Sequence, residues 1–366
     1  MTESFINKVI ELNEFSDRDF SYKSWSAPSN IALAKYWGKR AIQIPENPSV
    51  SFTLSTCRTN MAVIFSPKKN DVCVRQFYFD GAKNNNFGRK SFNLIEIISK
   101  DYPVFNNYDL QVISENTFPH SSGIASSASS MSALSLCLID ILRDIENSNR
   151  PEADFYQLSS HYARLGSGSA CRSIYGGVVQ WGSSDFTDLS SDEYAVQIEN
   201  IHPVFHDFRD SVLIVSSNKK AVSSTAGHEQ MDSHPFRQVR YQNAAKNCKD
   251  LISLMRKGEV WPWGEIVEKE ALELHGLMMN GPESFILLKP NTLNIIERVR
   301  TFRLDKNIPV FFTLDAGPNV HLLYPKEFKE VVEDFISKDL VEFCENEVWF
   351  NDFVGNGPQS FGGQQC

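Results

Sequence analysis

The chain has 366 residues, a formal charge of −9 and an ordinary apolar content of 42%. This length predicts about two domains, and the composition excludes a wholly disordered chain. The acidic balance, with a pI near 5.5, argues against nonspecific nucleic-acid binding, which needs clustered positive charge.

The predicted elements of the first half mix strands and helices. Residues 24–66 alternate around Val50, Phe52 and Leu54 and predict strands. Residues 77–86 predict a hairpin with its turn at Asp80-Gly81. Further along, the patterns predict a helix at 91–101, a strand at 108–114, helices from 126 and over 152–165, and a strand at 175–181.

The second half begins after a polar, acidic segment, and we place the domain boundary between residues 205 and 206. A strand is expected from 210, and two strands around a tight turn over 308–324. Helices are predicted over 235–257, 262–280, 291–303 and 326–338. The irregular order of strands and helices indicates an α+β fold. The glycine-rich end, taken alone, is typical of a disordered tail.

The sequence shows no targeting or membrane signal. Its first residues lack the basic start and apolar core of a signal peptide, and no stretch approaches the ~20 apolar residues that span a bilayer. The seven cysteines are widely spaced without a CxxC pair. They favour reduced thiols over disulfides or a zinc site. We therefore expect a cytoplasmic protein without a membrane partner.

The segment 118–134 is the strongest candidate for a ligand site. Seven of the twelve residues 121–132 are serine, and an amphipathic helix begins within the same segment. Small residues let a phosphate approach the backbone, and a helix N-terminus offers free N–H groups to it. A flexible serine-rich linker is the alternative, but a linker does not need the helix. No Walker A sequence or Rossmann glycine pattern occurs.

Positive charge gathers in three other segments of this acidic chain. Arg172 follows small residues in 163–177, where a guanidinium could bind a carboxylate or phosphate, although a solvated arginine in a tight loop is equally possible. Residues 26–40 place Lys35, Lys39 and Arg40 near aromatic residues, and taken alone this segment favours an edge strand with a basic end. Residues 216–227 combine two lysines with hydroxyls, as an ordinary surface loop also can.

Asp315 lies in LDAGPNV, directly after an apolar run and before a Gly-Pro turn. Aspartate favours such turns for local reasons. A carboxylate at the end of a buried strand can also be a catalytic group with a shifted pKa. The residues alone favour the turn former and leave the catalytic interpretation open.

Together these segments resemble one known family. PHSSGIASSAS resembles the phosphate-binding motif of the GHMP small-molecule kinases. The narrower similarity is to diphosphomevalonate decarboxylases, and it rests on NIALAKYWGKR, GSGSACRSIYGG, VSSTAG, LDAGPN and VGNGPQ, spread from Ser26 to Gln359. The resemblance implies a ribosomal-S5-domain-2-like α+β domain over 1–205, a ferredoxin-like GHMP C-terminal domain over 206–366, and an active site in the cleft between them.

The implied reaction is the ATP- and Mg²⁺-dependent decarboxylation of mevalonate 5-diphosphate to isopentenyl diphosphate, CO₂, ADP and phosphate in the mevalonate route to isoprenoids. Phosphorylation turns the tertiary alcohol into a leaving group, and the electrons of the departing carboxylate fill the electron-deficient carbon. Catalysis of this kind depends mainly on positioning and electrostatics. A homodimer is also implied.

By this resemblance Asp315 acts at the tertiary hydroxyl, Lys35 lies near the transferring phosphate, and Arg172 holds the substrate carboxylate with help from Asn30. The diphosphate side is assigned to Tyr36, Lys39, Ser169, Ser223 and Ser224. The ATP phosphates are assigned to Pro119, Ser121, Ser122, Gly123, Ile124, Ala125, Ser126 and Ser127, with Ser126 and Ser127 also meeting the metal.

The sequence departs from the family pattern at Pro119-His120-Ser121-Ser122-Gly123, at Asn47-Pro48-Ser49 and at Ala41. The first alternative is a related enzyme, a 3-kinase or decarboxylase, that acts on mevalonate or its monophosphate. A noncatalytic nucleic-acid-binding protein is a second, since the S5-like fold also occurs in translation, but the charge of −9 opposes it.

Overall fold

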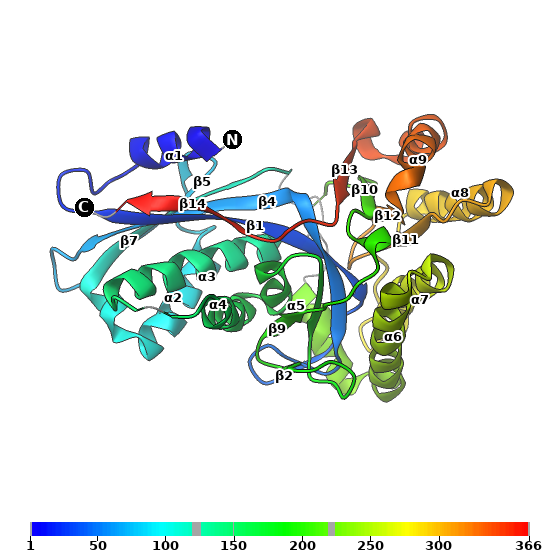
Figure 1. The fold of residues 1–366 in the computed structure, drawn as a ribbon, viewed down its shortest axis with the longest axis horizontal. Helices are drawn as coiled ribbons and strands as arrows, with labels where there is room; N and C mark the ends of the chain where they lie inside the picture. Colours follow the sequence, from blue (N-terminus) through cyan, green and yellow to red (C-terminus); the bar gives the residue numbers. More distant parts are fainter. Residues whose placement is uncertain (1, 119–125, 149, 219–223, 365–366) are drawn as a thin grey trace.

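Two β-sheets with helices packed on them organise the molecule (Figure 1). The computed structural model describes residues 2–118, 126–148, 150–218 and 224–364. The larger sheet has eight strands, and its main path runs β14-β1-β4-β7-β5-β6. Its strands are β1 (Ser21–Ala34), β4 (Ser49–Pro67), β5 (Arg75–Phe79), β6 (Ala82–Lys83), β7 (Tyr108–Asn116), β14 (Gln359–Gln364), and the side pair β8 (Val178–Trp181) and β9 (Ala195–Gln197).

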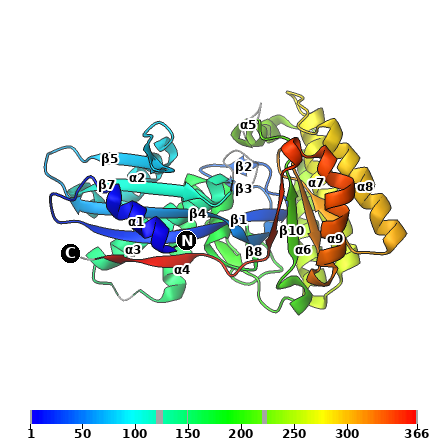
Figure 2. The same ribbon diagram turned by 90° about the horizontal axis from the view of Figure 1, so that it is seen from above.

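Helices cover both faces of this sheet because β4 is apolar on both sides. Met61 and Val63 pack in the cluster of α3, whereas Ala62 and Ile64 pack with α1 on the opposite face. Figures 1 and 2 show α1 on one side of the sheet and α2 to α4 on the other. The helices are α1 (Thr2–Glu11), α2 (Arg89–Asp101), α3 (Ser126–Ile145) and α4 (Glu152–Gly166).

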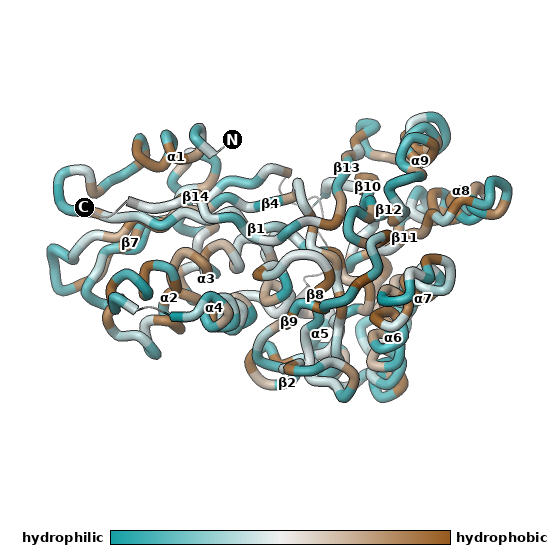
Figure 3. The backbone as a smooth tube through the Cα atoms, viewed as in Figure 1, coloured by the Kyte–Doolittle hydropathy of each residue, from teal (hydrophilic) through white to brown (hydrophobic). Residues whose placement is uncertain are grey.

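The second sheet has four antiparallel strands in the order β11-β12-β10-β13. Figure 3 shows hydrophobic and hydrophilic residues alternating along the helices beside it, as expected of amphipathic helices. The strands are β10 (Arg209–Leu213), β11 (Phe311–Thr313), β12 (Val320–Tyr324) and β13 (Trp349–Phe353). The helices are α6 (Arg237–Lys257), α7 (Val260–Asn280), α8 (Pro290–Lys306) and α9 (Lys329–Phe335), which continues into a π-helix at Ile336–Leu340.

Short elements connect these parts. A two-stranded ribbon joins β2 (Lys39–Arg40) to β3 (Ile44–Pro45), and α5 spans Ser224–Glu229. A 3₁₀ segment, η2, spans Gly168–Ile174. Other 3₁₀ turns lie at Pro103–Asn107, Pro203–Phe205, Gln230–Ser233, Lys326–Phe328, Val341–Phe343 and Glu345–Glu347. Within the described ranges, no helix is long and apolar enough to cross a membrane.

The predicted α+β class is confirmed, and so is the predicted hairpin. Strands β5 and β6 flank Asp80 and Gly81, whose φ angles of 47° and 84° are those of a tight hairpin turn. The interpretation of the glycine-rich end as a tail is wrong, since Gln359–Gln364 form β14. The sequence analysis did not predict α1, α5 or β13.

The ordering of β14 has a simple cause, because β1 offers it a free edge. Its pairing runs from Tyr22 opposite Gln364 to Ser26 opposite Gln359. The chain therefore returns from the second sheet to the first after β13. The chain first passes from the larger sheet to the second sheet before β10, and the boundary between residues 205 and 206 stays a prediction for that passage. The last strand, β14, belongs to the larger sheet.

Candidate active site

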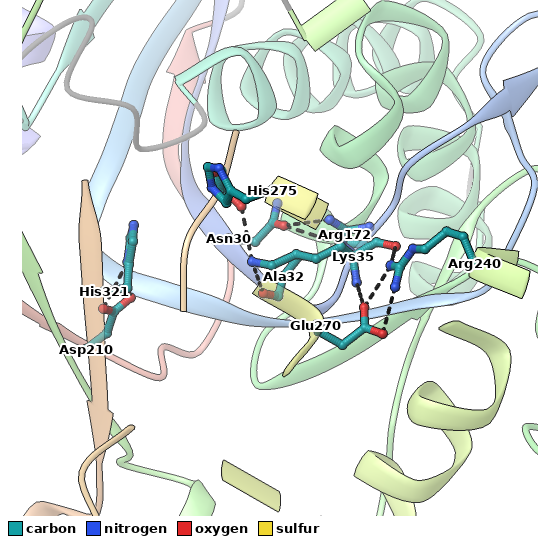
Figure 4. A network of polar contacts seen from close by, with 10 residues as sticks. Asn30, Ala32, Lys35, Arg172, Asp210, Arg240, Glu270, His275 and His321 are labelled. Carbon is teal, nitrogen blue, oxygen red and sulfur yellow. Dashed lines mark hydrogen bonds and ion pairs between the residues drawn. The ribbon is translucent and has the colours of Figure 1, made fainter. Parts of the chain in front are cut away.

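One charged residue from each sheet meets at the junction of the two parts. Lys35 follows the end of β1, and Asp315 lies in the turn between β11 and β12. The Lys35 Nζ lies 3.4 Å from Asp315 Oδ1. It also donates to the carbonyl oxygen of Ala32 at 2.7 Å, as Figure 4 shows. The lysine side chain is 2% exposed and the aspartate 28%. A ligand from solvent can therefore reach the Asp315 carboxylate but not the Lys35 ammonium directly.

Burial lowers the pKa of Lys35, and the nearby carboxylates of Asp315 and Glu270 oppose this effect. A buried lysine in contact with a part-exposed carboxylate is the kind of perturbed pair that marks functional sites.

Arg172 is the second charged group of the site, and its contacts are neutral. Its Nη1 donates to Ser49 Oγ at 2.6 Å, and its Nε and Nη2 donate to Asn30 Oδ1 at 3.3 and 3.2 Å. Within the described part of the chain, no carboxylate lies within 4 Å of this guanidinium. Burial lowers the pKa of Arg172, and the charge of Asp315 opposes this effect without outweighing it. The arrangement can accept an anion.

Asn30 and η2 fix the orientation of this guanidinium. The Asn30 side-chain amide donates to the carbonyl oxygen of Ser169 at 3.2 Å and to Ser173 Oγ at 2.8 Å. Both residues belong to η2, the segment that carries Arg172. The amide thus joins β1 to η2 and presents its oxygen to the arginine. The structure thus places Asn30, Ser169 and Arg172 in one connected group.

Small residues in η2 leave room for an aromatic wall beside the site. A Cβ atom at Gly168 would lie 2.9 Å from the Trp181 ring and 3.0 Å from Tyr36. The Tyr36 ring packs against Trp181 and His228 at centroid distances of 4.6 and 4.3 Å. Any larger residue at position 168 would separate Tyr36 from η2.

Lys39 lies in β2, three residues after Tyr36. Between them Gly38 donates its backbone N–H to His228 Nδ1 at 3.0 Å. Burial first, and then the charge of Lys39, lowers the pKa of His228 to about 3, so the imidazole is neutral. Lys39 is therefore near the ring cluster that contains Tyr36.

The predicted phosphate loop falls partly outside the described residues. Pro119, Ser121, Ser122, Gly123, Ile124 and Ala125 lie there, as does Ser223, while Ser224 is the first residue of α5. Ser126 and Ser127 begin α3, whose first turn contains no acidic residue. The Ser167 hydroxyl donates to Ser127 Oγ at 3.4 Å, directly before η2. The start of α3 is thus joined to the segment that carries Arg172.

The sequence analysis did not find several polar residues that hold the site. Ser49 binds Arg172, whereas Arg240, Asn247 and Glu270 form a buried network behind Lys35. His275 Nε2 donates to the carbonyl oxygen of Asp315 at 3.1 Å. Only Ser49 lies in a segment that the family resemblance had marked. The described residues hold no group of three or more His, Cys, Asp or Glu side chains that could bind a metal ion.

Comparison with known proteins gives a consistent result over most of the chain. Residues 27–195 match the model of the diphosphomevalonate decarboxylase-like N-terminal domain, and 211–354 match the mevalonate 5-diphosphate decarboxylase C-terminal domain. The diphosphomevalonate decarboxylase of Ganoderma lucidum is 30% identical over 84% of this chain and 80% of its own length. That of Schizosaccharomyces pombe is 29% identical over 84% and 79%.

Solved structures agree with these matches. Mevalonate diphosphate decarboxylase from Staphylococcus aureus superposes with a TM-score of 0.80 at 27% identity, covering 93% of this chain and 98% of its own. The Enterococcus faecalis enzyme, described with a mevalonate diphosphate-mediated ATP binding mechanism, gives 0.78 at 28% identity, with 94% and 99% covered. A structure described as MDDEF in complex with MVAPP, AMPPCP and magnesium gives 0.80 at 29% identity, also with 94% and 99%.

Proposed function

The chain belongs to the diphosphomevalonate decarboxylase family, and we propose that it decarboxylates mevalonate 5-diphosphate with ATP through the residues around Asp315. The products are isopentenyl diphosphate, CO₂, ADP and phosphate, within the mevalonate pathway. The observation that carries this proposal is Arg172, a buried guanidinium without a close carboxylate partner among the described residues, beside the Lys35–Asp315 pair. It is a counter-charge for a substrate carboxylate.

Asp315 is the group that acts on the tertiary hydroxyl. Asp315 is the part-exposed member of the pair, so its carboxylate can contact a bound ligand directly. The buried Lys35 ammonium lies on the other side of that carboxylate, away from solvent. The positive charge of Lys35 favours the ionised carboxylate, which can then accept the hydroxyl proton or stabilise charge on it.

Arg172 orients the substrate carboxylate. Two of its five N–H groups have no partner among the described residues, and a planar guanidinium binds a carboxylate through two parallel hydrogen bonds. Such a clamp aligns the breaking C–C bond with the departing phosphate. Asn30 contributes by holding the guanidinium, and Tyr36, Lys39, Ser169, Ser223 and Ser224 bind the diphosphate side.

The start of α3 suits ATP phosphates, since it combines serine hydroxyls with a helix N-terminus and no acidic side chain. Ser126 and Ser127 would hold the phosphates and Mg²⁺ together with residues 119–125. ATP supplies the phosphoryl group that makes the tertiary oxygen a leaving group, and Mg²⁺ neutralises its phosphate charge.

A coupled ADP-release assay with simultaneous CO₂ detection tests this function. Purified protein, MgATP and mevalonate 5-diphosphate should yield equal amounts of ADP, phosphate and CO₂. Mevalonate and mevalonate 5-phosphate serve as competing substrates. ADP without CO₂ would identify a kinase, and faster turnover of the monophosphate would support the alternative of a related GHMP enzyme, which the family matches do not favour.

We also propose a cytoplasmic homodimer, as the family resemblance implies. Light scattering coupled to gel filtration tests the dimer, and the expected mass is twice the chain mass of 41.5 kDa. A mass of one chain at working concentration would contradict it.

A further inference from the structure

The backbone of Lys35 lies where the sheet no longer provides hydrogen-bond partners. Pairing between β1 and β4 ends with Ala34 opposite Val50. Lys35 is 2% exposed, so water cannot satisfy its N–H and C=O groups. A buried backbone group without a partner is costly, and the chain must satisfy both groups in another way.

A buried ion pair from the helical layer of the second part satisfies them. The Lys35 N–H donates to Glu270 Oε2 at 2.8 Å, and Arg240 Nη2 donates to the carbonyl oxygen of Lys35 at 3.0 Å. This oxygen also accepts from Asn47 Nδ2 at 3.1 Å, so the N–H depends on Glu270 while the carbonyl has two donors. Arg240 and Glu270 join each other through two hydrogen bonds of 2.9 and 2.8 Å. Figure 4 shows these residues as one closed circuit around the peptide groups of Lys35.

The side chains of this circuit are shielded from water. The side chains of Arg240 and Glu270 are both 0% exposed, and Asn247 donates to Glu270 Oε1 at 2.7 Å. Moving two charges out of water costs several kcal/mol per ion, and apolar side chains often join helices at lower cost. Apolar residues could not bind both backbone groups of Lys35. The charges therefore have a use that packing alone does not supply.

The same helix, α7, also holds the opposite member of the catalytic pair. His275 lies five positions after Glu270 and donates to the backbone carbonyl of Asp315 at 3.1 Å. We propose that α7, with Arg240 of α6, is the positioning element that sets the separation of Lys35 and Asp315. Glu270 and Arg240 hold the backbone of Lys35, and His275 holds that of Asp315. These are positioning residues, and the proposal rests on the roles of Lys35 and Asp315 in the proposed reaction.

The test compares Glu270→Gln with a matched variant, Asp109→Asn. Asp109 is also a buried carboxylate, bound to Arg18 Nη1 at 2.8 Å and to the backbone N–H of Val74 at 2.7 Å, in the larger sheet. Both substitutions remove a buried carboxylate charge, and both carboxylates accept hydrogen bonds from an arginine side chain and from a backbone N–H. Only Glu270 touches Lys35, so a general loss of stability affects both variants and a loss of positioning affects one.

We expect Glu270→Gln to lower kcat by about tenfold or more, because small displacements of catalytic groups have large effects. The KM values for ATP and mevalonate 5-diphosphate should change by less than about threefold, since the Glu270 side chain is 0% exposed and out of reach of a ligand. Asp109→Asn should lose thermal stability and keep kcat. Assays run at a temperature where circular dichroism shows each variant folded.

Arg240→Lys provides a second variant if Glu270→Gln does not fold. A lysine keeps the charge beside Glu270 but cannot donate to Glu270 and to the Lys35 carbonyl in the guanidinium geometry. Its kcat should fall in the same way. The double variant should be no slower than the slower single variant, because the two side chains act as one unit.

Hydrogen exchange of the Lys35 amide gives a readout that needs no substrate. Its protection should fall by at least about tenfold in Glu270→Gln and stay unchanged in Asp109→Asn. Unchanged kcat and unchanged Lys35 protection in Glu270→Gln and Arg240→Lys would overturn the proposal. If the wild type does not decarboxylate mevalonate 5-diphosphate, the proposed function fails, and the exchange experiment still decides whether this circuit holds Lys35.

Discussion

Two buried arginines, one in each part of the molecule, show how differently the same side chain can be used. Arg172 in η2 is 2% exposed and Arg240 in α6 is 1% exposed. Arg240 binds Glu270 twice and lies 3.3 Å from Glu273. Arg172 binds only neutral oxygens. Equal burial thus accompanies opposite electrostatic surroundings.

The pKa directions follow this difference. Burial lowers the pKa of Arg172. Burial also acts on Arg240, but Glu270 and Glu273 outweigh it and raise the pKa. A guanidinium paired with buried carboxylates stabilises the structure, whereas one with only neutral hydrogen-bond partners can pair its charge with an anionic ligand. This comparison separates the binding residue from the positioning residue.

The largest expected effect comes from removing the carboxylate that faces the Arg172 site. Asp315→Asn keeps the shape of the side chain and removes its charge, so it should fold and bind ATP. Turnover should fall by on the order of 10³-fold, because the hydroxyl loses its proton acceptor. Single-turnover ADP release, with ATP binding measured by calorimetry, checks this. Near-normal turnover of a pure sample would exclude the assigned role.

The second experiment tests the two arginines against each other. Arg172→Lys keeps the charge but loses the two-pronged geometry, so kcat should fall by about 10²-fold with little change in ATP binding. Arg240→Lys should lower the free energy of unfolding by about 1–3 kcal/mol, since it breaks charged hydrogen bonds in a dry site. Urea unfolding and steady-state kinetics measure both. A fully active Arg172→Lys enzyme would contradict the carboxylate clamp.

A smaller effect is expected at the start of α3. Ser127→Ala removes one hydroxyl from the proposed phosphate site and should weaken productive use of ATP by about 1.5–3 kcal/mol. The affinity for mevalonate 5-diphosphate should change less. Steady-state kinetics with each substrate varied in turn check this. If the ATP kinetics were normal and the affinity for mevalonate 5-diphosphate fell, Ser127 would belong to the mevalonate 5-diphosphate site and the ATP assignment would be wrong.

The last prediction concerns the pH dependence of stability near the aromatic wall. Burial lowers the pKa of His228 from 6.5 to about 3, so the unfolded chain binds a proton there more readily than the folded chain. Its contribution is complete above the unfolded pKa and is lost as the pH falls toward the folded value, at about 1.4 kcal/mol per pH unit.

His228→Gln should therefore flatten the loss of stability between pH 6 and pH 4, which urea unfolding at several pH values measures. Glutamine retains an acceptor for the Gly38 N–H. An unchanged pH slope in this variant would contradict a neutral His228 in the folded state.

The comparison also separates what could be predicted from the sequence. Arg172 and Asp315 lie in short segments where charge stands among small or turn-forming residues, a local pattern visible without coordinates. Arg240 and Glu270 lie within long helices, where their sequence neighbours do not distinguish them from other helical residues. A charged residue on a helix is usually solvated, and only tertiary packing shows that these two are dry.

The ends of the chain repeat this lesson. Residues 355–366 contain few apolar side chains and appear locally like a tail, yet Gln359–Gln364 pair with the free edge of β1 as β14. Backbone hydrogen bonding to a distant strand has no local signature, because any sequence carries the N–H and C=O groups for it.

The sequence alone determined the α+β class, the elements with clear periodicity, and a set of chemical groups suited to phosphates and a carboxylate. Those properties depend on neighbours within one helix turn or strand repeat. The tertiary structure decided which groups meet: Lys35 with Asp315 from the other sheet, Asn30 with Arg172, and Glu270 with the Lys35 backbone across 235 positions. Such contacts depend on how the two parts pack, and residues far apart in the chain carry no record of that packing in their local patterns.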